Sequence, residues 1–253
     1  MTCLEPTVPV SPAAHQPSQV RIALVLPQLV GGYGDRGNAV VLVQRLRWRG
    51  IGCELVEVTG ATPVPSDCDV YVVGGAEGGG QLTAARRLRA DPGLSRAVAR
   101  GATVLAVCAG FQLLGTGFAG PDGTMHPGAG LFDAVTRPMP RRAMGEVVVD
   151  PAPGLGIRAI TGYENHAGAT RLGPAAGPLG RVVTGVGNGV DDVEGAVQGR
   201  LVGTYLHGPV LARNPDLADL LLGWATGHRL APLVLEEIEA LRHERLRHRP
   251  VTT

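Results

Sequence analysis

Apolar residues in the first half of the chain form short continuous runs that alternate with helically spaced segments. The runs VRIALVLP, CELVEV, DVYVVGG and TVLAVC have the length and composition of buried strands. The segments between them, NAVVLVQRLRWRG, QLTAARRLRAD and LSRAVARG, have the spacing of helices. Strands that alternate with helices in this way predict an α/β fold, with a doubly wound, mostly parallel sheet covered on both faces.

The pattern changes after about Gly117 to short β-prone pieces separated by Gly and Pro, such as GLFDAV and GEVVVD. These pieces predict a small antiparallel β insertion. Helical spacing returns in NPDLADLLLGWATG and LVLEEIEALRHERLRHR, and no internal repeat or linker divides the chain. We predict a disordered tail over residues 1–19, one domain over 20–230 and a C-terminal helix over 231–253.

Charge and cysteine content narrow the function classes. The 253 residues carry 23 basic residues, all Arg, against 22 acidic ones, and a net charge of +1 does not provide the basic field of a nucleic-acid binder. The four cysteines form no C-x-x-C pair and are too sparse for a disulfide framework. With no segment that resembles a signal peptide or membrane span, we expect a cytoplasmic protein without a metal site.

One cysteine stands where parallel sheets place reactive groups. Cys108 ends the apolar run TVLAVC and precedes a helical segment, with small residues at Ala109 and Gly110 that suit a tight strand-to-helix turn. A thiol at a helix N-terminus is favoured as thiolate, so Cys108 is a candidate nucleophile. The alternative is a buried small apolar residue, which is the expectation for Cys53 and Cys68.

Two histidines are candidate bases for this thiol. His207 closes the apolar stretch LVGTYLH and precedes a Gly-Pro loop, while His166 lies in the polar segment GYENHAGAT. Position alone leaves both open. The glycines Gly74 and Gly75, at the end of DVYVVGG, could bring backbone amides close to an oxyanion, although such turns are common.

Four motifs resemble those of a known family. AVCAGFQ is similar to the G-x-C-x-G-x-Q segment of class I glutamine amidotransferases, with Ala106 in place of the first glycine. ENHAGAT and GTYLHGP resemble the cobyric acid synthase-like (CobB/CobQ-like) branch, and together with YGDRGN at 33–38 they are most similar to its GatD subfamily. The resemblance extends from about Arg21 to Thr226, and it implies a flavodoxin-like amidotransferase fold.

The resemblance also implies a glutaminase reaction and assigns roles to individual residues. Cys108 would attack the glutamine side-chain amide, and His207 would act as acid and then as base. Gln112 and Arg142 would bind the substrate, although the adjacent Arg141 leaves the second assignment ambiguous by one residue. The backbone amides of Gly75 and Ala109 would stabilise the oxyanion.

The implied partner is a MurT-like ligase, in a heterodimer that amidates the D-glutamate α-carboxyl of lipid II during peptidoglycan synthesis. The chain has no G-x-x-x-x-G-K-[ST] loop, so we expect ATP and Mg²⁺ on the partner and no cofactor here. Three alternatives remain: a corrinoid carboxylate as acceptor, an inactive regulatory subunit, and a peptidase-like Cys–His protein. Gln112 and the His207 loop disfavour the last.

The acid that class I enzymes usually carry two residues after the histidine is replaced by Pro209. Such an acid orients the imidazole and stabilises its protonated form. We expect the ligase partner to supply this carboxylate, which would make the isolated chain a poor glutaminase. Asp216 and Glu164 are the alternatives within the chain.

Overall fold

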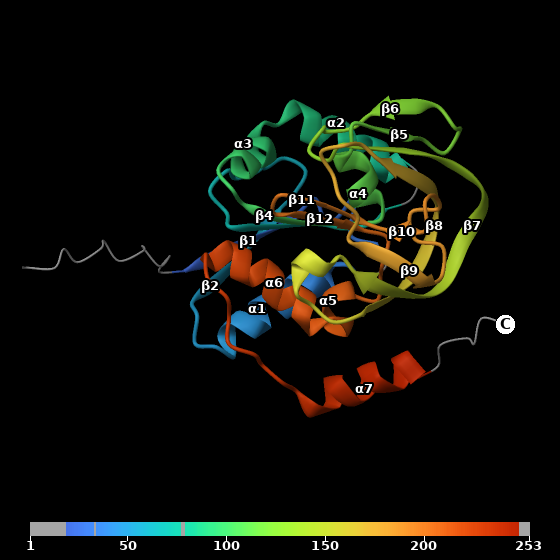
Figure 1. The fold of residues 1–253 in the computed structure, drawn as a ribbon. Helices are drawn as coiled ribbons and strands as arrows, with labels where there is room; N and C mark the ends of the chain where they lie inside the picture. The colour runs from blue at the N-terminus through green and yellow to red at the C-terminus, as the bar shows by residue number, and fades with distance from the viewer. Residues whose placement is uncertain (1–18, 33, 77–78, 248–253) are drawn as a thin grey trace, which may run out of the picture.

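A mostly parallel six-stranded sheet forms the centre of the computed structural model, which describes residues 19–32, 34–76 and 79–247 (Figure 1). The strand order is β11-β12-β4-β3-β1-β2, and only the β11–β12 pair is antiparallel. The strands are β1 (Val20–Val25), β2 (Cys53–Val58), β3 (Val70–Val73), β4 (Thr103–Val107), β11 (Ala196–Gln198) and β12 (Leu201–Thr204). The predicted doubly wound sheet is therefore confirmed.

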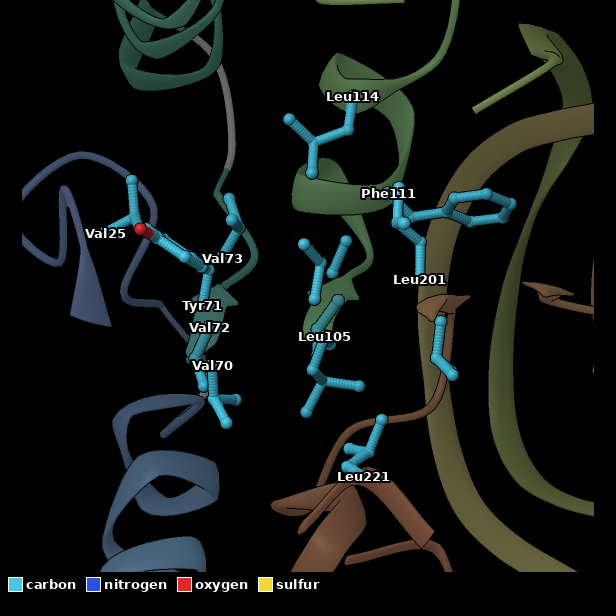
Figure 2. Close-up of a cluster of buried hydrophobic side chains, with 14 of the residues drawn as sticks. Val25, Val70, Tyr71, Val72, Val73, Leu105, Phe111, Leu114, Leu201 and Leu221 are labelled. Atoms are coloured by element: carbon cyan, nitrogen blue, oxygen red, sulfur yellow. The ribbon is translucent and has the colours of Figure 1, made fainter. Parts of the chain in front are cut away.

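Continuous apolar runs form the central strands because both faces of the sheet are covered. Every residue of β3 and β4 is buried, and their side chains pack against those of neighbouring elements in the core (Figure 2). One layer contains α2 (Gly79–Ala90), α3 (Gly93–Ala99) and α4 (Ala109–Leu114), and the opposite layer contains α1 (Arg36–Arg47), α5 (Val210–Arg213) and α6 (Pro215–Thr226) (Figure 1).

A second sheet lies beside the first and is built around two long strands rather than the short pieces that the sequence predicts. β7 (Ala134–Pro151) and β8 (Ile160–Leu172) pair antiparallel, with a register shift between Pro138 and Ala143. Proline cannot donate to a strand ladder, so it is tolerated at this irregularity while the strand continues beyond it. The smaller strands are β5 (Gly117–Ala119), β6 (Met125–Pro127), β9 (Gly180–Thr184) and β10 (Val193–Glu194).

The C-terminal helix α7 (Glu236–Arg247) docks mainly through polar contacts. The buried Arg242 guanidinium donates to the carbonyls of Arg213 and Ala159 and to Oδ1 of Asn214. Asn214 precedes α6 but makes no side-chain cap, because its amide bonds to Thr161, Val210 and Arg242 instead. A short 3-10 helix, η1 (Pro153–Leu155), joins β7 to β8, and the predicted tail up to residue 18 lies outside the described residues.

Candidate active site

Cys108 occupies a strained turn between β4 and α4. Its backbone has φ 52° and ψ −109°, a left-handed conformation that non-glycine residues rarely adopt. The turn is held by Cys108 N, which donates to the carbonyl of Thr204 at 2.7 Å, and by Gly110, where a Cβ would lie 2.4 Å from the carbonyl oxygen of Val73. The predicted strand-to-helix turn at Cys108 is confirmed.

His207 lies immediately beyond the neighbouring strand, β12. Its backbone forms a two-way bridge with Tyr163 of β8, with His207 N donating to Tyr163 O at 2.8 Å and Tyr163 N donating back at 3.3 Å. A Cβ on Gly75 would lie 3.1 Å from His207 Cε1 and 3.4 Å from Cys108 Cβ, so both side chains flank the same glycine. The parallel sheet thus brings Cys108 and His207 together.

A third side chain completes this group, and it comes from the loop after β1. The buried carboxylate of Asp35 places Oδ1 3.3 Å from Nδ1 of His207 and accepts a hydrogen bond from Gly75 N at Oδ2, at 2.7 Å. Gly37, in the first turn of α1, packs against Pro209, where a Cβ would lie 2.3 Å from Pro209 Cγ. Asp35 therefore occupies the orienting position that the sequence leaves vacant.

The electrostatic environment of His207 favours its protonated form. Burial, the largest single effect, lowers the pKa of the imidazole, but hydrogen bonds and charge interactions with Asp35 and the Cys108 thiol raise it overall to about 9. An imidazolium between a carboxylate and a sulfur is the arrangement expected of a cysteine nucleophile with an acid–base histidine.

An open pocket of about 470 Å³ leads to Cys108. Its lining includes Gln112 and Arg142 but not Arg141, and Arg142 donates from Nε to Oδ1 of Asn165 at 2.6 Å. Among the described lining residues Arg137 and Arg142 are cationic, and none is Asp or Glu. A pocket of this size and charge suits a small molecule with a carboxylate.

The two predicted oxyanion donors lie in different surroundings. The Gly75 amide already donates to Asp35, so its role as an oxyanion donor stays a prediction that would require this bond to be given up. Ala109 is the first residue of α4 and directly follows the nucleophile, and its role stays a prediction. Because the Gly75 carbonyl accepts from Gly32 N at 3.0 Å, the amide of Ala76 in the same trans peptide points the opposite way, and Ala76 lines the pocket.

Neither acid proposed from the sequence reaches His207. Asp216 lies in α6 and binds Arg158, with its Oδ2 2.6 Å from Arg158 Nε. Glu164 accepts from the amides of Val186 and Gly187, both at 2.8 Å, and therefore supports a loop. The carboxylate that we expected from the ligase partner is already present at His207, because Asp35 of this chain supplies it.

His166, the rival base, has a different environment from His207. Its ring stacks on Tyr205 with 3.7 Å between centroids, and Nδ1 lies 2.9 Å from the carbonyl oxygen of Gly168. Its Nε2 is 3.7 Å from Oε2 of Glu164. His166 lines the pocket, but its ring contacts Tyr205, Gly168 and Glu164 in the pocket wall rather than the Cys108 thiol.

The CobB/CobQ-like glutamine amidotransferase domain matches residues 21–215, which is most of the chain. The chain belongs to this family. Its relatives include the lipid II isoglutaminyl synthase (glutamine-hydrolysing) subunit GatD of Staphylococcus aureus, 35% identical over 82% of this chain and 84% of that protein. The GatD subunit of Streptococcus pneumoniae is 30% identical over 82% of this chain and 81% of its own length. Cobyric acid synthase of Sphingopyxis alaskensis is 33% identical, over 68% of this chain but 34% of its own length.

Solved amidotransferase structures share the fold. A glutamine amidotransferase crystal structure has a TM-score of 0.52 at 20% identity, with 80% of this chain and 98% of that chain covered. The Thermotoga maritima amidotransferase has a TM-score of 0.51 at 16% identity, with 92% and 94% covered. The predicted fold class is confirmed by these similarities.

Asp35 is the site residue that sequence reasoning missed in this member of the amidotransferase family. A signal was present, because YGDRGN follows the first predicted strand, and the carboxyl ends of parallel strands share one edge. Within the described residues no group of three or more His, Cys, Asp or Glu side chains could hold a metal ion. No helix in the same part of the chain has the length and apolar content needed to cross a membrane.

Proposed function

We propose that this chain is the glutamine-hydrolysing subunit of a lipid II isoglutaminyl synthase. The observation that carries the proposal is the Asp35–His207–Cys108 group, whose Cys108 lines a pocket that also contains Arg137 and Arg142. The choice of lipid II rests on the GatD relatives, which this chain covers over more than four-fifths of their length.

The chemistry begins with the Cys108 thiolate, which attacks the side-chain carbonyl carbon of glutamine to form a tetrahedral intermediate. His207, protonated near neutral pH, donates its proton to the departing ammonia. The resulting γ-glutamyl thioester is then attacked by water, from which His207 removes a proton. Glutamate leaves, and the Cys108 thiolate and the protonated His207 are restored.

Asp35 and two backbone amides would support these steps. The Asp35 carboxylate holds the ring of His207 with Nδ1 facing Asp35, and it stabilises the imidazolium. The amides of Ala109 and Ala76 are the candidate oxyanion donors, since the Gly75 amide is bound to Asp35. Arg142 would bind the α-carboxylate of glutamine through its guanidinium.

The ammonia would pass to a MurT-like ligase bound in a heterodimer. That partner would hold ATP and Mg²⁺, activate the α-carboxyl of D-glutamate in the lipid II stem peptide, and amidate it to D-isoglutamine. A free thiol nucleophile functions under reducing conditions, so we place this reaction in the cytoplasm.

The test is to purify the chain with its ligase partner and measure glutamate release and lipid II amidation with ATP and glutamine. We expect one amide formed for each glutamate released, and no amidation without the ligase. A corrinoid substrate is assayed in parallel, because cobyric acid synthases match 68% of this chain. Amidation of the corrinoid but not of lipid II would overturn the choice of acceptor, and no glutamate release would overturn the glutaminase.

A further inference from the structure

A chain of side-chain hydrogen bonds crosses the floor of the pocket and begins at a residue with no assigned role. Nε2 of Gln81, in α2, donates to Oε1 of Gln112 at 2.7 Å. Nε2 of Gln112 donates to the hydroxyl of Tyr205 at 3.2 Å. The Tyr205 hydroxyl lies 2.6 Å from Oγ1 of Thr170, which lies 2.7 Å from Oγ1 of Thr136. Gln81 and Gln112 both line the pocket beside Cys108.

Each member of this chain restricts the orientation of the next. A side-chain amide has an acceptor end and a donor end, and Gln81 occupies the acceptor end of Gln112. The donor end of Gln112 is thereby directed to Tyr205. Burial raises the pKa of the Tyr205 phenol to about 12, so the hydroxyl keeps its proton; it accepts from Gln112, and in its contact with Thr170 either hydroxyl can be the donor.

Close packing also holds the Gln112 amide in place. A Cβ on Gly168 would lie 2.5 Å from Nε2 of Gln112 and 3.2 Å from the Tyr205 hydroxyl, so a larger residue at position 168 would displace the amide from this position. Nε2 carries two N–H groups, of which Tyr205 accepts one. The second is left for a ligand in a pocket whose charged lining residues, within the described structure, are Arg137 and Arg142.

We infer that Gln81 is a positioning residue that orients the Gln112 amide, so that the pocket presents an N–H donor to the carboxylate end of its glutamine substrate. This inference rests on the proposed glutaminase function. An amide turned the other way would direct its carbonyl oxygen at a carboxylate and weaken binding. Gln81 should therefore affect capture of the amino acid and leave the Cys108–His207 pair unchanged.

The experiment uses the full chain co-purified with its ligase partner and compares Gln81→Met with the wild type. Methionine has a similar length but cannot donate to Gln112. We expect the KM for glutamine to rise about 10-fold, the effect of losing one hydrogen bond, while kcat stays within about twofold. Thr83→Ala, on the exposed face of the same helix, is the matched control and should leave both constants unchanged.

Two alkylating reagents separate positioning from a general structural role. A chloroketone analogue of L-glutamine carries the α-amino-acid group, whereas iodoacetamide does not. In Gln81→Met the chloroketone should alkylate Cys108 about 10-fold more slowly, and iodoacetamide should react at the wild-type rate. Tyr205→Phe removes the acceptor at the other end of Gln112. It should likewise slow alkylation by the chloroketone and leave the rate with iodoacetamide unchanged.

The outcomes distinguish this inference from the function on which it rests. Wild-type enzyme that releases no glutamate overturns the proposed function and the inference together. Active wild type with an unchanged KM in Gln81→Met overturns the inference alone. Equal slowing by both reagents assigns Gln81 a structural role and also overturns it.

Discussion

The imidazole Nδ1 of His207 lies 3.3 Å from Oδ1 of Asp35, although 172 positions separate the two residues in the sequence. The second oxygen of the same carboxylate accepts from the Gly75 amide. One side chain thus orients the base and also holds the loop that passes between the base and the nucleophile.

Replacing Asp35 tests this relationship directly. In Asp35→Asn the loss of the negative charge should lower the pKa of His207 below 9, because one of the two groups that raise it is removed, and reduce kcat on the order of 10²- to 10⁴-fold. The pH dependence of Cys108 alkylation, measured beside glutaminase activity, reports both effects. Asp69→Asn is the control, since that carboxylate also accepts a backbone amide but lies outside the pocket. An unshifted alkylation profile in Asp35→Asn would remove Asp35 from the acid–base group.

Replacing the nucleophile should separate the two half-reactions. We expect Cys108→Ser to abolish glutamate release while leaving complex formation with the ligase intact, because only the reacting atom changes. Ammonia supplied directly should still support amidation. Cys53→Ser, at the start of β2, serves as the control cysteine variant. Retention of more than a few per cent of the wild-type glutaminase rate, on the scale expected for removal of a nucleophile, would contradict the assignment of Cys108.

The role of Arg142 in binding is tested by glutamine saturation. Arg142→Ala removes a guanidinium from the pocket, and we expect the KM for glutamine to rise about 10- to 150-fold, the equivalent of about 1.5–3 kcal/mol. The neighbouring Arg141→Ala should leave the curve unchanged, because Arg141 does not line the pocket. The reverse result would transfer the role to Arg141.

Buried Glu194 should make folding stability depend on pH. Burial raises the pKa of this carboxyl from 4.5 to about 7. Hydrogen bonds from Tyr205 N and Thr204 Oγ1 lower the pKa but do not offset the effect of burial. A folded pKa above the unfolded value means that the folded state binds more protons between these pH values. The stabilisation is therefore complete below pH 4.5 and is lost as pH rises through 7, by up to about 3 kcal/mol.

Glu194→Gln has no proton to lose and should not show this decline. Its free energy of unfolding in urea should exceed that of the wild type by about 1–3 kcal/mol at pH 8, and the difference should vanish near pH 4.5. Glu164→Gln is the contrasting variant: its carboxylate accepts two backbone amides, so the change should destabilise. A wild-type stability that does not fall between pH 5 and 8 would refute the raised pKa.

Features that depend on local pattern could be predicted from the amino-acid sequence. Continuous apolar runs predicted the buried strands β1, β3 and β4, because a strand covered on both faces has no polar side. The apolar run before Cys108 and the small residues after it predicted the strand-to-helix turn at which Cys108 lies. The end of another apolar run placed His207 at the same edge of the sheet.

Which groups meet at that edge depends on the order of the strands in the folded sheet. The strand order sets β1 beside β3, β3 beside β4 and β4 beside β12, and this order brings Asp35, Gly75, Cys108 and His207 together. Acids chosen for their position in the sequence, Asp216 and Glu164, were wrong because chain separation does not report distance across a parallel sheet. In the second sheet, prolines at an irregularity allowed β7 to continue where local pattern predicted a break. Local pattern encodes burial and turns, whereas the neighbours of a strand are set by packing of the whole domain.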